Sequence, residues 1–359
     1  MQTNNWRKTK FTKLTGIDFP IVQGPFGGGF SSIELTAKVS NFGGLGSFGA
    51  QPFTAAEIVD YCNNIRKQTE KPFNINLWVS NRDERLNEYT EDDYNKLKEA
   101  FRPYFEHFGV PLPEMPKDLG PVFEDQIQGV LDSKPDVFSF VYGIPEPDIL
   151  ERCRSLGIKT VGNATTVDEA IALETAGVDA IVATGFEAGG HRVSFLRTAE
   201  DSLTGLFSLI PQVADAVSVP VIAAGGIADV RGMKAAFALG ADAVQMGTAF
   251  LATKESNATQ SHKDRLFGPE GKYTTLTKLF SGRLARGFSS RLTKEISIDD
   301  AVIAPYPMQG RFMKDLRAAA LKDAADFITL WSGQSAPLLK YHEAETLLQS
   351  LVDGMETEI

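Results

Sequence analysis

Short apolar runs recur along the chain, and most of them are followed by glycine or a small polar residue. A continuous apolar run of about four to eight residues is typical of a strand that is buried on both faces. Helical patterns lie between most of these runs. The eight runs that we interpret as strands cover residues 21–24, 44–48, 73–79, 137–142, 159–164, 180–184, 220–224 and 243–247.

Capping signals open several of the intervening helices. Thr54 with Glu57, and Thr166 with Glu169, fit the capping box. Strands that alternate with helices pair in parallel, and eight such units close into a (β/α)8 TIM barrel. A doubly wound open sheet would show similar local units, but no Gly-x-Gly-x-x-Gly fingerprint follows the first strand. We therefore predict an α/β TIM barrel with a smaller excursion over its C-terminal mouth.

Two similar segments within the sequence support the predicted barrel. Residues 173–182 and 237–244 share a helix end, a glycine, an aspartate and a strand start. Gly177 and Gly240 are expected to end their helices in the left-handed region of backbone space, which side-chain-bearing residues avoid. Repeated strand and helix units of this kind are what a barrel is made of.

Two stretches interrupt this rhythm. Residues 80–121 are charged and proline-bearing, and Thr90 with Asp93 opens a helix inside them. Its apolar residues recur at helical spacing, which predicts packing on the outside of the barrel or on a second subunit rather than a ligand box. We assign residues 1–250 and 310–359 to the barrel, with 80–121 as a helical insertion, and residues 251–309 to a small cap or substrate subdomain. The apolar stripe of the insertion consists of Tyr94, Leu97, Phe101, Phe105 and Phe108.

Composition narrows the class of protein. The hydrophobic fraction is 43%, as in globular proteins, and no run approaches the roughly 20 apolar residues that cross a bilayer. The N-terminus has no apolar signal core, so we expect a cytoplasmic protein without a membrane partner. A net charge of -10 argues against a nucleic-acid partner. Cys62 and Cys153 are far apart, which supports neither a disulfide framework nor a thiolate metal site.

His191 is the titratable residue most suggestive of catalysis. It ends the loop Glu187-Ala-Gly-Gly-His191, which follows the sixth predicted strand, where barrel enzymes place their chemistry. A neutral imidazole there could accept a proton near pH 7. Glu187 could be a second acid or base, or could cap a helix or turn. The other three histidines are scattered, so no metal site is expected.

The ends of the last two predicted strands suggest a phosphate site. Backbone N–H groups in Gly225-Gly226 and in Gln245-Met246-Gly247-Thr248 could hold a phosphate, as is common in barrels. Across the mouth, Gln23-Gly24 ends the first strand and Asn76 lies in the third. Amide groups there could hydrogen-bond the edge of a flat heteroaromatic ring. Together these features indicate flavin mononucleotide (FMN).

Seven motifs give the chain a family resemblance over almost its whole length. The chain resembles the nitronate monooxygenase family, also called 2-nitropropane dioxygenases. The motifs are Gln23-Gly-Pro25, Phe73-Asn-Ile-Asn76, Gly185-Phe-Glu-Ala-Gly-Gly-His191-Arg192, Ala223-Ala-Gly-Gly-Ile227, Gln245-Met-Gly-Thr248, Gly282-Arg-Leu-Ala-Arg-Gly287 and Trp331-Ser-Gly-Gln334.

The resemblance implies an activity and several residue roles. It implies a barrel that binds FMN non-covalently and oxidises alkyl nitronates with O2 to a carbonyl compound and nitrite, with nitroalkanes as further candidate substrates. By position, His191 becomes the catalytic base, and Asn76, Gly189, Gly226 and residues 245–248 become FMN contacts. Thr184 stands where the family commonly has glutamine, and its shorter side chain would reach less far toward the flavin.

Other readings stay open at this point. The same histidine loop occurs in FMN-dependent enoyl-acyl-carrier-protein reductases, and related barrels reduce quinones with NADH. A flavin-binding or phosphate-sensing barrel without catalysis is the non-enzymatic alternative. Arg283 and Arg286 could hold an anion or could pair with carboxylates. A homo-oligomer is compatible with the chain, and the sequence does not identify the physiological substrate.

Overall fold

The computed structural model describes residues 6–323, 327–328 and 330–357, and its centre is one eight-stranded parallel sheet. The strand order is β1-β9-β8-β6-β5-β4-β3-β2. A parallel bridge between Val22 and Leu45 joins the first strand to the last, so the sheet closes on itself and the predicted TIM barrel is confirmed. The strands are β1 Ile21–Gln23, β2 Gly46–Gly49, β3 Phe73–Trp78, β4 Val137–Val141, β5 Lys159–Ala164, β6 Ala180–Thr184, β8 Val221–Ala224 and β9 Ala243–Met246.

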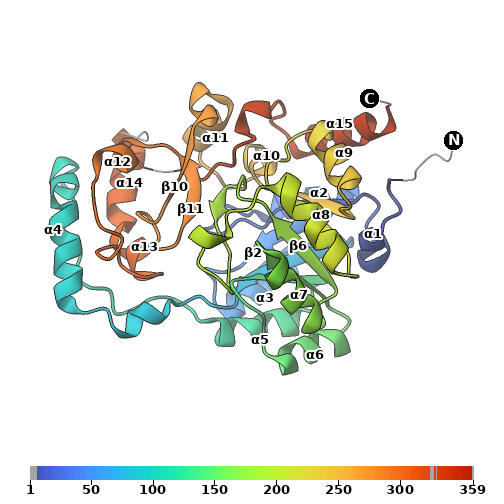
Figure 1. Ribbon diagram of the computed structural model, residues 1–359, viewed down its shortest axis with the longest axis horizontal. Coiled ribbons are helices and arrows are strands. Elements are labelled where there is room, and N and C mark those ends of the chain that lie inside the picture. The colour runs from blue at the N-terminus through green and yellow to red at the C-terminus, as the bar shows by residue number, and fades with distance from the viewer. Residues whose placement is uncertain (1–5, 324–326, 329, 358–359) are drawn as a thin grey trace.

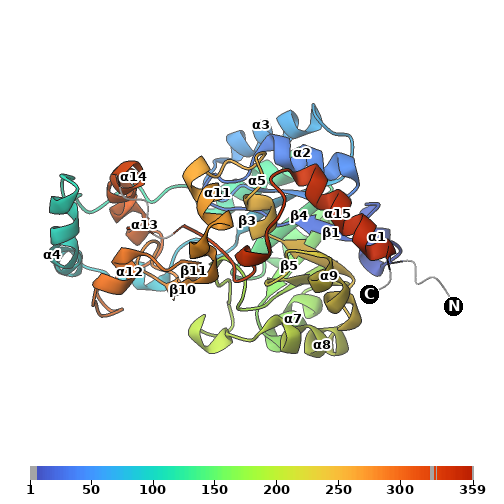
Figure 2. The ribbon, with the colours of Figure 1, turned by 90° about the horizontal axis from the view of Figure 1, so that it is seen from above.

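Helices surround this sheet on its outside (Figures 1 and 2). Alternate strand residues serve two cores: Ile181 packs outward against the helices, whereas Val182 packs inside the barrel. Phe11 belongs to the inner core, because α1 (Lys10–Thr15) precedes the first strand and lies across that end. The surrounding helices are α2 Ile33–Phe42, α3 Ala55–Arg66, α5 Phe123–Ser133, α6 Pro147–Ser155, α7 Val167–Thr175, α8 Leu206–Ala216, α9 Val230–Ala238 and α15 Ala344–Glu356.

A second hydrophobic core lies beside the barrel. It joins the insertion after β3 to the segment after β9, and we call this part the cap. Both ribbon views show α4 beside α13 and α14, away from the barrel helices (Figures 1 and 2). After β9, α10 Thr248–Leu251 leads into the cap, whose elements are α4 Glu91–His107, α11 Gln260–Phe267, β10 Thr274–Thr277, β11 Ala285–Phe288, α12 Arg291–Glu295, α13 Met308–Phe312 and α14 Lys314–Asp323.

The insertion helix α4 packs where the sequence did not place it. Phe101 and Phe105 lie 5.3 and 5.1 Å from Phe312 of α13, measured between ring centroids. The stripe is therefore packing, as predicted, but its partner is the cap and not the outside of the barrel. Buried residues as far as Ala336 share this core, whereas α15 packs against the barrel helices α2 and α9. We propose residues 80–121 and 251–336 as the cap, which extends beyond the predicted boundary at 309.

The helix signals agree with the structure in most places. Capping boxes form at Thr54 and at Thr90. Thr166 caps α7, but the Glu169 carboxylate turns away from it and accepts the Thr165 and Phe195 N–H groups instead. Gly177 and Gly240 have φ angles of +86° and +104°, as predicted for helix stops. Within the described ranges, none of the helices is long and apolar enough to cross a membrane.

Replacing Phe101 with alanine should destabilise the cap. The ring is fully buried, and removing such a side chain from a core typically costs about 3–5 kcal/mol of unfolding free energy. Phe207→Ala is the matched control because the Phe207 side chain is 75% exposed. Chemical denaturation of the two variants checks this expectation, and equal stabilities would show that the cap core contributes little.

Candidate active site

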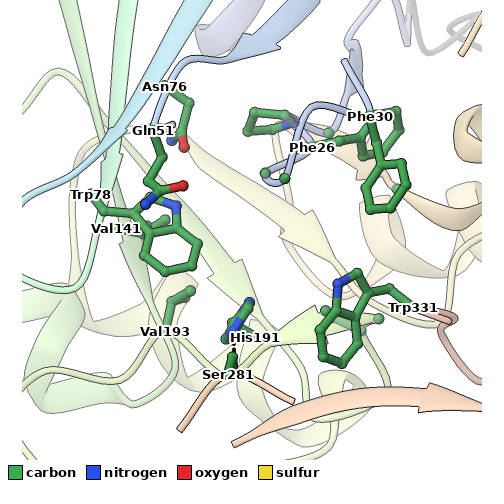
Figure 3. A pocket seen from close by; sticks show the side chains of 18 of the residues that line it. Phe26, Phe30, Gln51, Asn76, Trp78, Val141, His191, Val193, Ser281 and Trp331 are labelled. Carbon is green, nitrogen blue, oxygen red and sulfur yellow. Dashed lines mark hydrogen bonds between the residues drawn. The ribbon is translucent and has the colours of Figure 1, made fainter. Parts of the chain in front are cut away.

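A cavity of about 630 Å³ opens at the C-terminal ends of the barrel strands, beneath the cap. Pockets of this size are typical of small-molecule and cofactor sites. Asn76 and Trp78 come from one side of the barrel, Phe26 and Phe30 from the loop after β1, and Trp331 from the segment after α14 (Figure 3). The barrel ends and the cap thus share one site.

Most residues predicted for the site do line this cavity. The glycines after β8 have φ angles of +111° for Gly225 and +69° for Gly226, which side-chain-bearing residues rarely adopt. The predicted residues that line the cavity are Gly24, Asn76, Thr184, Gly189, His191, Gly225, Gly226, Gln245, Gly247 and Thr248.

Two predicted contacts are absent from the wall. The Gln23 side chain is fully buried: its Oε1 accepts the Ser47 N–H at 2.8 Å, and its Nε2 donates to the Gly24 carbonyl. Met246 is also fully buried and packs in the core between strands and helices. Because side chains alternate along a strand, Gln245 lines the cavity and the Met246 side chain points the other way. The predicted flavin contact of the Gln23 amide is thus not supported.

His191 is held by strand pairing rather than by the barrel. It lies in the short strand β7 (Gly190–His191), which pairs antiparallel with β11 of the cap, opposite Ala285. Next to it, the Arg192 N–H donates to the Leu284 carbonyl at 2.8 Å. The Arg192 guanidinium is buried and donates to the carbonyls of residues 184, 185 and 202. These bonds fix the loop on both sides of the imidazole.

Ser281 sets the hydrogen bonding of the imidazole. The Ser281 hydroxyl donates to the Arg283 carbonyl at 3.1 Å, and its oxygen lies 2.9 Å from His191 Nε2 (Figure 3). With its one proton used on that carbonyl, the hydroxyl accepts from Nε2–H. Nδ1 then carries the lone pair, so this nitrogen is the basic one.

Burial in the cavity wall, together with the smaller effect of the positive charges of Arg283 and Arg317, lowers the pKa of His191 to about 3. The imidazole is therefore neutral at physiological pH. Aromatic rings surround it: the centroid distances are 5.0 Å to Trp78, 5.3 Å to Trp331 and 6.3 Å to Tyr306. These rings make much of the neighbourhood of His191 apolar.

Acid should destabilise the folded protein through its buried histidines. Burial also lowers the pKa of His262 to about 4, so the folded state stays unprotonated there while the unfolded chain binds a proton below about 6.5. Unfolding free energy should therefore fall as the pH drops from 6.5 toward 4. His262→Gln should flatten this slope by up to about 1.4 kcal/mol per pH unit. Denaturant unfolding at several pH values tests it, and an unchanged slope would contradict it.

The three charged residues whose roles the sequence left open, Glu187, Arg283 and Arg286, have structural partners. Glu187 accepts the Leu206 N–H with both carboxylate oxygens, at 2.9 and 3.1 Å, and so caps α8. Arg283 pairs with Asp83 at 2.6 Å and stacks between Tyr142 and Tyr306. Arg286 donates to the Phe186 carbonyl and to Thr274. None of these three side chains lines the cavity.

Several cavity residues were missed by the sequence analysis. Gln51 follows β2, and its amide donates to the Tyr306 hydroxyl at 2.6 Å. Asn163 ends β5, and its Oδ1 accepts the Thr184 hydroxyl at 3.0 Å. Their position at the C-terminal ends of strands could have identified them from the sequence, because these ends carry barrel active sites. The described residues contain no group of three or more His, Cys, Asp or Glu side chains arranged for a metal ion.

The family model and a curated relative name the same family. The family model described as nitronate monooxygenase matches residues 8–354. A probable nitronate monooxygenase of Staphylococcus aureus (strain JH9) is 39% identical over 350 residues, which are 97% of each chain. Among solved structures, nitroalkane oxidase from Streptomyces ansochromogenes superposes with a TM-score of 0.87 at 34% identity, covering 97% of this chain and 98% of that one.

A further solved structure bears on the alternatives. FabK from Thermotoga maritima superposes with a TM-score of 0.75 at 27% identity, covering 97% of this chain and 96% of that one. The family model and the relatives identify an oxidoreductase, and flavin dependence follows from the family. The chain belongs to the nitronate monooxygenase family.

Proposed function

We propose that the cavity binds FMN and that the protein oxidises alkyl nitronates with O2 to a carbonyl compound and nitrite, with His191 as the base for neutral nitroalkanes. The observation that carries this proposal is a neutral imidazole in an apolar wall of a cavity whose other wall is built from glycine-rich strand ends. Family membership supports the reaction class.

The cavity residues fit FMN. A Cβ built at Gly247 would meet nothing within 4 Å, so the space beside this glycine belongs to the cavity. Gly225 and Gly226 line the cavity at the neighbouring strand end, and together these two strand ends suit a phosphate. The Asn76 side chain points into the cavity (Figure 3), and its Nδ2 donates to Ser139 at 2.9 Å. Its Oδ1 is available to a donor on a ring edge.

The chain's own residues prepare the substrate. Nδ1 of His191 accepts the α-proton of a neutral nitroalkane, while Nε2–H stays bonded to Ser281. The charges of Arg283 and Arg317 oppose formation of the imidazolium. The charge of Arg317, which lines the cavity, stabilises the nitronate anion that proton removal creates. A bound flavin supplies the electron-accepting chemistry that no side chain offers.

A base with so low a pKa removes carbon-bound protons slowly, because proton transfer weakens as basicity falls. A preformed nitronate needs no such step and brings a negative charge to a positively charged cavity. We therefore infer a preference for nitronates over neutral nitroalkanes. Thr184 is engaged with Asn163, so we assign it a place in the flavin wall without a direct role in the reaction.

Oxygen consumption by the flavin-loaded protein tests the proposal. The protein should consume O2 with ethyl nitronate in the absence of NAD(P)H and should release nitrite. The likeness to FabK keeps an NAD(P)H-dependent reductase on this scaffold as the second candidate. NAD(P)H oxidation coupled to an enoyl thioester or a quinone, without O2 uptake on nitronate, would move the assignment to that candidate.

A further inference from the structure

The cap lines the cavity with three cations, which we call the cationic row: Arg311, Lys314 and Arg317. Among the residues that line the cavity, none is aspartate or glutamate. This local balance is opposite to that of the whole chain, which carries 46 acidic and 36 basic residues. In the described part of the chain, the Lys, Arg, Asp and Glu side chains that line the cavity are therefore all positively charged.

The cationic row has no carboxylate partner. Within the described ranges, no ion pair within 4.0 Å involves any of the three side chains. Other cations nearby do have such partners: Arg283 pairs with Asp83, and Lys278 with Glu200 and Asp300. A guanidinium held away from water without a partner is costly, so a counter-charge from a ligand would stabilise it.

The row leads from the mouth into the cavity. Arg311 and Lys314 are exposed, whereas Arg317 is half-buried and close enough to His191 to lower its pKa. The residues follow at intervals of three along α13 and α14, so their Cα atoms span about 9 Å at the helical rise. The Arg311 guanidinium also lies beside Gly120, whose carbonyl accepts from Arg82. Mutual repulsion of these charges leaves the mouth ready for an anion.

The row is separate from the proposed cofactor phosphate position. That position lies at Gly226 and Gly247, just after strands β8 and β9, and uses backbone groups, whereas the row uses side chains of the cap. We propose that the cationic row binds the phosphate or diphosphate group of a second ligand that reaches His191. This inference rests on the proposed function. Forked guanidinium groups and an ammonium spread over this length match several phosphate oxygens better than one carboxylate.

Two kinds of ligand carry that group. One is a phosphorylated nitronate or nitroalkane whose reacting carbon lies at His191. The other is a nucleotide co-substrate whose diphosphate lies on the row. Both share the phosphate chemistry, and comparing small and nucleotide probes separates them.

Calorimetric titration of the flavin-loaded protein tests the row. The probes are inorganic pyrophosphate, propyl phosphate, adenosine diphosphate and succinate. Lys314→Gln and Arg317→Gln should each weaken pyrophosphate binding about 10- to 100-fold, because each removes a charge-assisted hydrogen bond. Arg317→Lys should lose less. Lys322→Gln removes an exposed lysine of the same helix outside the cavity and should bind pyrophosphate like the wild type.

Each outcome decides the proposal. Tighter binding of adenosine diphosphate than of pyrophosphate supports the nucleotide, and equal binding of propyl phosphate and pyrophosphate supports the phosphorylated substrate. Succinate binding as tightly as pyrophosphate, or no weakening in the variants, overturns the proposal. Loss of FMN from the variants would assign the row to the cofactor instead. Turnover of ethyl nitronate is measured separately, so failure of the proposed reaction remains distinguishable from failure of the row.

Discussion

Replacing His191 with asparagine is expected to lower turnover of neutral nitroalkanes by about 10²- to 10⁴-fold, which is the usual contribution of a general base. Turnover of preformed nitronates should fall far less, because that substrate has already lost its proton. Asparagine keeps a polar side chain but has no basic nitrogen, and it is too short to replace the bond between Nε2 and Ser281. Steady-state kinetics on nitroethane and ethyl nitronate measure the two effects.

The pH dependence and a control sharpen this expectation. With the pKa of His191 lowered to about 3, wild-type activity on nitroalkanes should hold from pH 7 to well below 6.5 and decline only as the imidazole becomes protonated. His107→Asn removes an exposed histidine of α4 and should leave both activities unchanged. Equal losses on both substrates in a flavin-loaded His191→Asn protein would mean that His191 positions the ligand instead.

Replacing Gly247 with valine should abolish FMN binding while the protein stays folded. The added side chain meets no protein atom within 4 Å of its Cβ, so it enters the cavity where the cofactor phosphate is proposed to lie. The ratio of flavin to protein after purification, together with the denaturation midpoint, measures both parts. Full flavin content in this variant would contradict the proposed position of the cofactor phosphate.

Two further variants distinguish the loss of cavity space for FMN from the loss of fold stability. Ala318→Val adds a similar bulk to the exposed face of α14 and should retain FMN. Gly189→Val should instead destabilise the fold, because a Cβ there would lie 2.5 Å from the Gly333 nitrogen. Gly189 thus serves close backbone packing, whereas Gly247 leaves room for a ligand.

The barrel was predictable because its signals are local. Each buried run and each glycine stop specifies its own strand or helix end, and parallel order follows from their alternation. His191 and most of the predicted strand-end residues line one cavity for the same reason, since the C-terminal ends of all barrel strands meet at one mouth. Gln23 does not line the cavity, because two backbone groups inside the barrel use its amide.

The cap was less predictable because it depends on contacts between distant segments. Nothing local indicates that Phe101 meets Phe312, or that Ser281 meets His191, 90 residues apart in sequence. The cationic row was overlooked because Arg311, Lys314 and Arg317 look like an ordinary solvated helix face. Only the fold shows that this face is turned toward the cavity.

The pairing of β7 with β11 limits how freely the cap could be exchanged between related barrels. The barrel contributes the loop that carries His191, but the hydrogen-bonding partner of its strand belongs to the cap. A chimera that joined this barrel to a foreign cap would need to reproduce the register of Ala285 opposite His191, together with a hydroxyl at position 281. Barrel and cap are therefore expected to be inherited as one unit rather than exchanged as independent parts.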